Sequence, residues 1–328
     1  MEKKKTKKKI NSSTFLLMIT IVLFAVMYIA GMIIFNDKGF AKPQMFMNLF
    51  ISNAGLIVIG CGMTLVMITG GIDISVGSVT ALVCMSAAYA MENKGMSAVA
   101  AVAISLLIGT LFGIVQGYLV TYLEIQPFIV TLAGMFFGRG LTAVISTDMI
   151  AIQNKTFLKW ANYRINLPFG TYNRRGVFIP AYIYPTVIIA LAVVILITLM
   201  LKFTKFGRSL YAIGGNQQSA VMMGLDVKKT KMKAYVLDGF LAGLGGFLFC
   251  LNSCAGFVEQ AKGLEMDAIA SAVIGGTLLS GGVGTVVGTL FGVLINGTIS
   301  SLITTQGTLS SWWVRITLSA LLCFFICL

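Results

Sequence analysis

The chain has 328 residues, of which 57% are hydrophobic and only 11% charged, and its mean hydropathy is +0.92. Soluble domains carry about 25% charged residues, so this composition excludes an ordinary soluble protein and indicates an integral membrane protein. The net charge of +13 does not by itself indicate a nucleic-acid partner, because thirteen of the twenty-four Lys and Arg residues flank apolar runs. Six lie in the first ten residues and seven between Lys202 and Lys233. This distribution is typical of cytoplasmic segments of membrane proteins, and the N-terminal lysines can also contact anionic lipid.

Apolar runs of about 20 residues are long enough to cross a bilayer as helices. The sequence therefore predicts an all-α polytopic membrane protein of about ten transmembrane helices, some of them discontinuous or short. The third and eighth runs are short and are interrupted by Gly and Ser, and the first run is read as a retained span rather than a cleaved signal. The predicted spans are 14–35, 46–69, 76–91, 97–120, 127–147, 179–201, 234–254, 267–283, 285–305 and 311–328.

Alternation of these spans predicts the orientation of the loops. If the basic segment 1–13 is cytoplasmic, the segment 148–178 is external and the basic segment 202–233 is cytoplasmic. The external segment also carries five basic residues, but it is polar and contains Pro168 and Gly170, so we expect a folded external lobe. Residues 14–328 are expected to form one membrane domain that includes both segments.

Glycines at four-residue spacing mark two of the predicted helices. Gly109, Gly113 and Gly117 form one row, and Gly284, Gly288 and Gly292 form another. Small residues at this spacing let helix backbones approach closely, which predicts tight packing inside one bundle. The stretch GTLFGIVQG at 109–117 also resembles GTLFGVLING at 288–297, a weak internal repeat that is compatible with duplicated halves or with chance.

One aspartate lies in an apolar context, in the stretch GGIDISVGS at 70–78. A carboxylate at membrane depth costs roughly 3 kcal/mol on insertion scales, so Asp73 needs a compensating role. It could cap the helix that follows, together with Ser75 and Ser78, or a helix broken at the glycines could line a polar cavity. No second aspartate in an apolar span offers an obvious partner, which argues against intramembrane aspartyl catalysis.

Signatures of other chemistry are missing from the sequence. There is no G-x-x-x-x-G-K-[ST] phosphate-binding loop, and a chain without histidine has neither H-E-x-x-H nor a Cys/His zinc site. We therefore expect no catalytic residues, no metal and no cofactor. The six cysteines lie in or beside apolar runs and are interpreted as packing residues in a reduced setting.

The segment 202–233 has a different character. It is polar and basic, and it contains a helical stretch, NQQSAVMMGL, which Asn216 can cap. An amphipathic helix in a cytoplasmic loop favours docking to another protein, and the alternative is a solvated loop whose charges set only the orientation.

Several long stretches, taken together and in order, resemble the permease subunits of bacterial monosaccharide ABC importers of the ribose, xylose and arabinose branch. They are GCGMTLVMITGGIDISVGSV, QPFIVTLAGMFFGRG, YAIGGNQQSAVMMGL and LEMDAIASAVIGGTLLSGGVGTVVGTLFG, spread from about residue 46 to the C-terminus. The last stretch, with GTLSSWW, is most similar to galactofuranose importer permeases. Family members usually continue with a short charged tail, so an end at CFFICL suggests a truncated sequence.

The resemblance implies a permease in the bacterial inner membrane, with its N-terminus cytoplasmic. Its expected partners are a second homologous permease, a cytoplasmic ATP-binding cassette subunit, an extracytoplasmic sugar-binding protein and the monosaccharide itself. ATP hydrolysis is then expected on the partner subunit, and galactofuranose or a similar sugar is the expected substrate. The alternatives are a stand-alone sugar facilitator or secondary carrier, and a membrane enzyme.

The resemblance also assigns residues. The loop that matches Gly214–Gly224 carries the family's coupling helix, and the related pattern E-A-A-x-x-x-G has a glutamine here in place of its glutamate. We expect a sugar path lined by the broken region Gly70–Ser78. The residues expected along the path are Asn53, Asp73, Ser75, Ser78, Gln126, Phe128 and Thr131, and those expected to contact the ATPase are Tyr211, Gly214, Gly215, Asn216, Gln218, Ala220 and Gly224.

Overall fold

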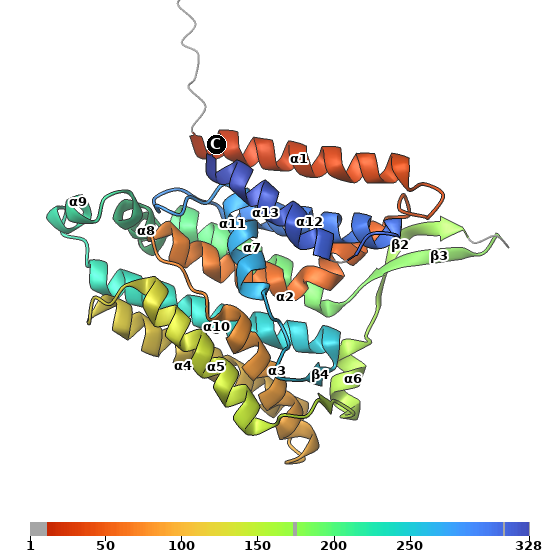
Figure 1. The fold of residues 1–328 in the computed structure, drawn as a ribbon, viewed down its shortest axis with the longest axis horizontal. Helices are drawn as coiled ribbons and strands as arrows, with labels where there is room; N and C mark the ends of the chain where they lie inside the picture. Colours follow the sequence, from red (N-terminus) through yellow and green to blue (C-terminus); the bar gives the residue numbers. More distant parts are fainter. Residues whose placement is uncertain (1–11, 173–175, 311, 328) are drawn as a thin grey trace, which may run out of the picture.

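A computed structural model describes residues 12–172, 176–310 and 312–327, so most of the basic segment 1–13 lies outside the described residues. Helices dominate, and two small two-stranded sheets accompany them (Figure 1). The helices are α1 (Ser12–Ile34), α2 (Pro43–Ile68), α3 (Val76–Glu92), α4 (Ala98–Thr121), α5 (Pro127–Ile145), α6 (Lys155–Ala161), α7 (Pro185–Phe203), α8 (Lys205–Gly215), α9 (Gln217–Met222), α10 (Val227–Ser253), α11 (Leu264–Ile274), α12 (Val286–Gln306) and α13 (Trp312–Cys327). The strands are β1 (Ile150–Ala151), β2 (Ile165–Tyr172), β3 (Phe178–Ile183) and β4 (Ala255–Gly256).

The helices follow the order of the predicted spans, but α3, α11 and α13 are shorter than the long membrane-spanning helices. Within the described residues, seven helices are long and apolar enough to cross a membrane, namely α1, α2, α4, α5, α7, α10 and α12. The run 76–91 gives α3, with 17 residues, and the final run gives α13, with 16. The predicted span 267–283 is wrong in its bounds, because α11 occupies only Leu264–Ile274 and a glycine-containing loop follows it. The polytopic all-α class is confirmed, with short helices where glycines interrupt the apolar runs.

The two polar segments lie at opposite ends of the bundle (Figure 1). The hairpin of β2 and β3 is attached to the beginning of α2, where the Gln44 side chain donates to the Tyr182 carbonyl and accepts from its amide. The strands β1 and β4 pair antiparallel, which ties the chain after α5 to the chain after α10. The helices α8 and α9 form the other end. The segment 148–178 is therefore folded over most of its length, as expected, with residues 173–175 outside the description.

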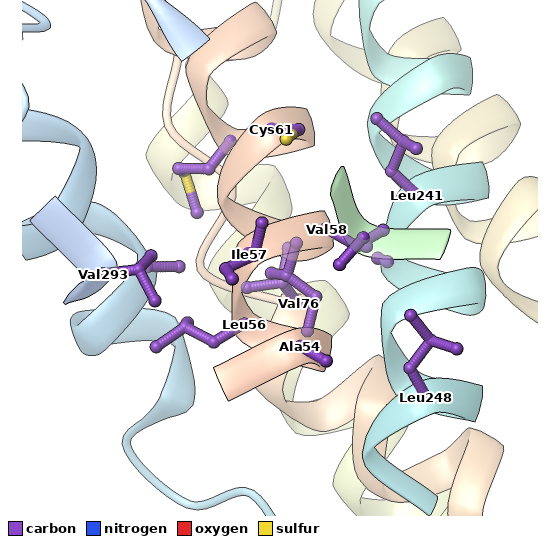
Figure 2. Close-up of a cluster of buried hydrophobic side chains, with 14 of the residues drawn as sticks. Ala54, Leu56, Ile57, Val58, Cys61, Val76, Leu241, Leu248 and Val293 are labelled. Carbon is purple, nitrogen blue, oxygen red and sulfur yellow. The ribbon is translucent and has the colours of Figure 1, made fainter. Parts of the chain in front are cut away.

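The core of the bundle is built around α2 and α10. Most of the residues in both helices are buried, and they pack on each other and on α3, α4, α11 and α12. Figure 2 shows Ile57 and Val58 of α2 among Leu241 of α10 and Val293 of α12. These aliphatic side chains position α2, which carries residues of the cavity described below and ends directly before Gly70–Ser78.

The glycine rows make close backbone contacts, as predicted. A Cβ atom at Gly109 of α4 would overlap the backbone of α10 at Gly239, and one at Gly292 of α12 would overlap the Ser271 carbonyl of α11. Substitution at either glycine therefore requires the helices to separate.

The two GTLFG stretches occupy similar surroundings. One lies on α4, which packs on the short helix α3, and the other lies on α12, which packs on the short helix α11. Each is followed by an amide residue and a glycine, and the amides are Gln116 and Asn296. The Gln116 amide donates to the Ser75 hydroxyl just before α3, and the Asn296 side chain lies beside Asp267 in the first turn of α11. The internal repeat therefore has a structural counterpart.

Candidate functional site

The stretch Gly70–Ser78 forms a buried break between α2 and α3. Gly70 has φ +80°, a backbone conformation that glycine adopts without strain, and it allows the chain to leave α2. The Asp73 Oδ1 accepts from the Ser75 amide at 2.7 Å, and the Ser78 hydroxyl donates to the Ser75 carbonyl at 2.7 Å. Asp73 therefore holds the turn that precedes α3, rather than capping amides inside the first helical turn.

Asp73 has a carboxyl partner that the sequence analysis missed. The Asp73 carboxyl lies against the Asp238 carboxyl of α10, and both side chains are buried. The sequence offered no obvious partner for Asp73, because Asp238 lies near the start of the predicted span 234–254, whereas α10 begins at Val227 and Asp238 lies well inside it. Neither oxygen of Asp238 receives an N–H or hydroxyl hydrogen bond from the described residues. The break and α10 therefore meet at two acidic side chains.

The structure separates the other predicted path residues into three groups. The Thr131 hydroxyl of α5 donates to the Ile72 carbonyl at 3.2 Å and is buried with Asp73, Ser75 and Ser78. Gln126 and Phe128 are exposed where α5 begins. Asn53 lies elsewhere, in the first half of α2, and lines a cavity. No single pocket brings all seven residues together within the described part of the chain.

The cavity that contains Asn53 has a volume of about 710 Å³, within the usual range for small-molecule sites. It lies between α2, α10, α11, α12 and α13, toward the hairpin end of α2. Its lining is rich in amide and hydroxyl groups, with one aromatic ring and one pair of opposite charges. The polar and aromatic residues that line it are Asn48, Ser52, Asn53, Asp267, Asn296, Ser300, Ser301, Thr304, Thr305, Trp312 and Arg315.

Two charged residues give this cavity a defined polarity. Asp267 lies beside Asn296 and in the field of the Arg315 guanidinium, which stands 5.8 Å from the centre of the Trp312 ring. The sequence analysis did not assign Asp267 or Arg315 to the path. The available signal was the repeat, which places Asn296 where Gln116 occurs in the first copy.

The α8–α9 segment presents a short apolar surface at the opposite end of the bundle. As predicted, Asn216 caps α9, with its Oδ1 accepting from the Ser219 amide at 2.8 Å. Ala220 is buried against Ile213 and Val227, whereas Gln218 is exposed. The residues Val221, Met222 and Met223 point away from the bundle, and Met222 is 87% exposed. Such an apolar group on a one-and-a-half-turn helix is suited to insertion into a partner's groove.

The remaining residues predicted for this segment fix its position. The Tyr211 hydroxyl donates to the Gly284 carbonyl at 2.8 Å, and Gly214 contacts the backbone at the end of α2. Gly224 has φ +79° and ends α9. Beside the segment, Lys228 pairs with Glu124 at 2.9 Å, and this hydrogen bond holds the pKa of the Glu124 carboxyl below its ordinary value.

Comparison with known proteins shows related sequences over nearly the whole chain. Residues 45–326 match the family described as branched-chain amino acid transport system / permease component. The inner membrane ABC transporter permease protein YjfF of Escherichia coli is 41% identical over 95% of this chain and 91% of its own length. The fructose import permease protein FruG of Bifidobacterium longum is 35% identical over 89% and 84%, and the ribose import permease protein RbsC of Bacillus subtilis is 38% identical over 81% and 78%. No solved structure matches the chain.

Proposed function

The chain belongs to the branched-chain amino acid transport system / permease component family of ABC transporter permeases, and from that premise we propose that it is the membrane subunit of an ATP-driven monosaccharide importer. Relatives named as ribose and fructose import permeases support a sugar rather than an amino acid as cargo. A galactofuranose-like sugar remains our specific proposal.

The polar cavity is the observation that carries the proposal. A monosaccharide presents many neutral hydroxyl groups, each a donor and an acceptor, so its path needs amides and hydroxyls more than fixed charges. The side chains of Asn53, Ser300, Ser301 and Thr304 meet that requirement, and the ring of Trp312 supplies a flat apolar face. We therefore assign the sugar route to this cavity, with Asn53 as a contact, and not to Asp73 or Ser75.

The opposite end of the bundle supports ATP-driven transport. The sequence has no phosphate-binding loop, so the energy must come from a partner. The apolar surface of Val221, Met222 and Met223 fits docking into a groove of that ATPase, with Asn216 and Ala220 holding the helix in place. Because glutamine replaces the glutamate of the related pattern at Gln218, this docking rests on packing rather than on charge.

The two ends define the proposed orientation. Basic residues gather in 202–233, which favours a cytoplasmic position for α8 and α9, and the β2–β3 hairpin end is then external. The cavity lies toward that external end, where an extracytoplasmic sugar-binding protein would deliver the sugar. A second permease, the same chain or a homologue, would complete the importer in the bacterial inner membrane, with the N-terminus in the cytoplasm.

The test is purification of the complex from its native host, followed by reconstitution into vesicles with the co-purified subunits. We expect a P-loop ATPase to co-purify, and uptake of labelled ribose, fructose or galactose to require ATP and the binding protein. Sugar equilibration by this chain alone, without ATP, would instead establish the facilitator alternative.

A further inference from the structure

The end of α8 contacts the break between α2 and α3 through backbone atoms. A Cβ atom at Gly214 would overlap both the Ile68 carbonyl oxygen, at the end of α2, and the amide nitrogen of Gly282. The Gly282 amide in turn donates to the same Ile68 carbonyl at 2.9 Å. Three segments that are distant in sequence therefore meet at one point, with no side chain between them.

A side-chain contact reinforces this junction. Tyr211, one turn before Gly214 on α8, donates its hydroxyl hydrogen bond to the Gly284 carbonyl. Gly282 and Gly284 lie in the loop that leads into α12, which begins at Val286. The segment before α9 is thus attached both to the end of α2 and to the entrance of α12.

The segment after α9 reaches the same break from the other side. The helix α10 begins at Val227, five residues after α9 ends, and carries Asp238. Asp238 is 0% exposed, and its carboxyl lies against that of Asp73 inside the break. The Tyr235 hydroxyl, also on α10, lies against Gly71, where a Cβ atom would be 2.5 Å from it. The segment before α9 thus contacts the last residue of α2, directly before the break, and the segment after α9 contacts the break itself.

These contacts matter for the cavity because three helices that line it, α2, α10 and α12, also reach the junction. The helix α2 ends there and carries Asn48 and Asn53 in its first half, while α12 starts beyond it and carries Asn296. Phe249 of α10 also lines the cavity. A displacement of α9 would thus move three walls of the cavity through rigid helices, because packed helices shift as units rather than deform.

We propose that the Gly70–Ser78 break is a mechanical relay between the ATPase-docking helix α9 and the cavity, with Gly214 and Asp238 as its two positioning residues. The inference rests on the proposed function and adds to it the route by which the two ends communicate. In this proposal Asp73 helps to pass the movement of α9 to the helices of the cavity, and it does not contact the sugar.

The test measures the cavity directly and needs no identified sugar. A cysteine at Ser301, in the cavity wall, is labelled with a membrane-impermeant maleimide in the native complex, after Cys254, Cys323 and Cys327 have been replaced by serine. In the otherwise unchanged chain, we expect ATP with vanadate to change the labelling rate. The Gly214→Ala variant should keep its co-purified ATPase and lose this change. Gly140→Ala in α5 is the matched control, because a Cβ at that position meets nothing within 4 Å outside its own helix.

A second pair of variants tests the contact between α10 and the break. It also keeps the proposal testable if the Gly214→Ala complex does not assemble. Asp238→Asn keeps a polar group against Asp73 and should preserve the response. Asp238→Leu removes the polar contact with Asp73 and should abolish the response in the complexes that assemble. A full response in assembled Gly214→Ala and Asp238→Leu complexes would overturn the relay. If the unchanged chain co-purifies no ATPase and shows no ATP response, the proposed function itself fails.

Discussion

The carboxyl groups of Asp73 and Asp238 meet inside the bundle, one from the break after α2 and the other from α10. Burial of two carboxyl groups so close together excludes two full charges, because neither would have a compensating cation. The contact therefore joins the break to α10 through two acidic side chains rather than through a pair of opposite charges.

This pairing predicts an asymmetry between two substitutions at Asp73. Asp73→Asn keeps an acceptor for the Ser75 amide and a donor for Asp238, so we expect expression and Tm close to those of the unchanged protein. Asp73→Ala leaves the Ser75 amide and the Asp238 carboxyl without partners, and should destabilise the protein by about 3 kcal/mol. Thermal unfolding of the purified protein in detergent distinguishes the two. Equal Tm values for both variants would contradict the structural role of the pair.

The glycine contact between α4 and α10 predicts a steric effect. Gly109→Ala places a methyl group on the backbone of Gly239, so the helices must separate, at a cost of about 1–3 kcal/mol. Gly140→Ala in α5 is the control, since no described atom lies within 4 Å of its Cβ position. We expect a lower Tm for the first variant and an unchanged or slightly higher Tm for the second, since alanine favours helix. A Tm for Gly109→Ala at or above that of the control would argue against the contact.

The apolar surface of α9 predicts a docking defect without a folding defect. Met222→Lys places a charge where we expect the partner's groove, while its solvent exposure makes the change harmless to the isolated chain. Co-purification of the ATPase should be lost, with the amount of protein in the membrane unchanged. Met96→Lys, at an exposed methionine between α3 and α4, should leave co-purification intact. Retention of the ATPase by Met222→Lys would refute docking through α9.

The cavity predicts a transport defect at Asn53. Its Nδ2 is bonded to the Leu49 carbonyl, which leaves the side-chain oxygen to accept from a sugar hydroxyl. Asn53→Leu removes that acceptor and should weaken recognition by about 1–3 kcal/mol, which corresponds to roughly a fivefold to a hundredfold loss. The measurement is the concentration dependence of labelled sugar uptake by vesicles. Asn93→Leu, at an exposed position just after α3, should leave uptake unchanged.

Local sequence patterns were sufficient to predict much of the arrangement of helices. Hydropathy located the long helices, the glycine spacing located close helix contacts, and Asn216 marked the beginning of α9. These features depend on neighbours along the chain. The Asp238 partner depends on how α10 packs against the break, and the cavity depends on five helices at once, so neither has a local signature. Gln126 and Phe128 were predicted from their context beside α5, and the structure leaves them apart from Asn53.

Gln116 and Asn296 occupy equivalent positions in the two GTLFG stretches, but their surroundings differ, which indicates different roles for the two halves of the chain. In the first half, the Gln116 amide is buried and donates to the Ser75 hydroxyl, which holds the turn before α3 in place. In the second half its counterpart faces open space beside Asp267. Variants that alter sugar preference should therefore concentrate around α11, α12 and the first half of α2. Variants around α3 and α4 should instead change how many molecules of ATP are consumed for each sugar delivered.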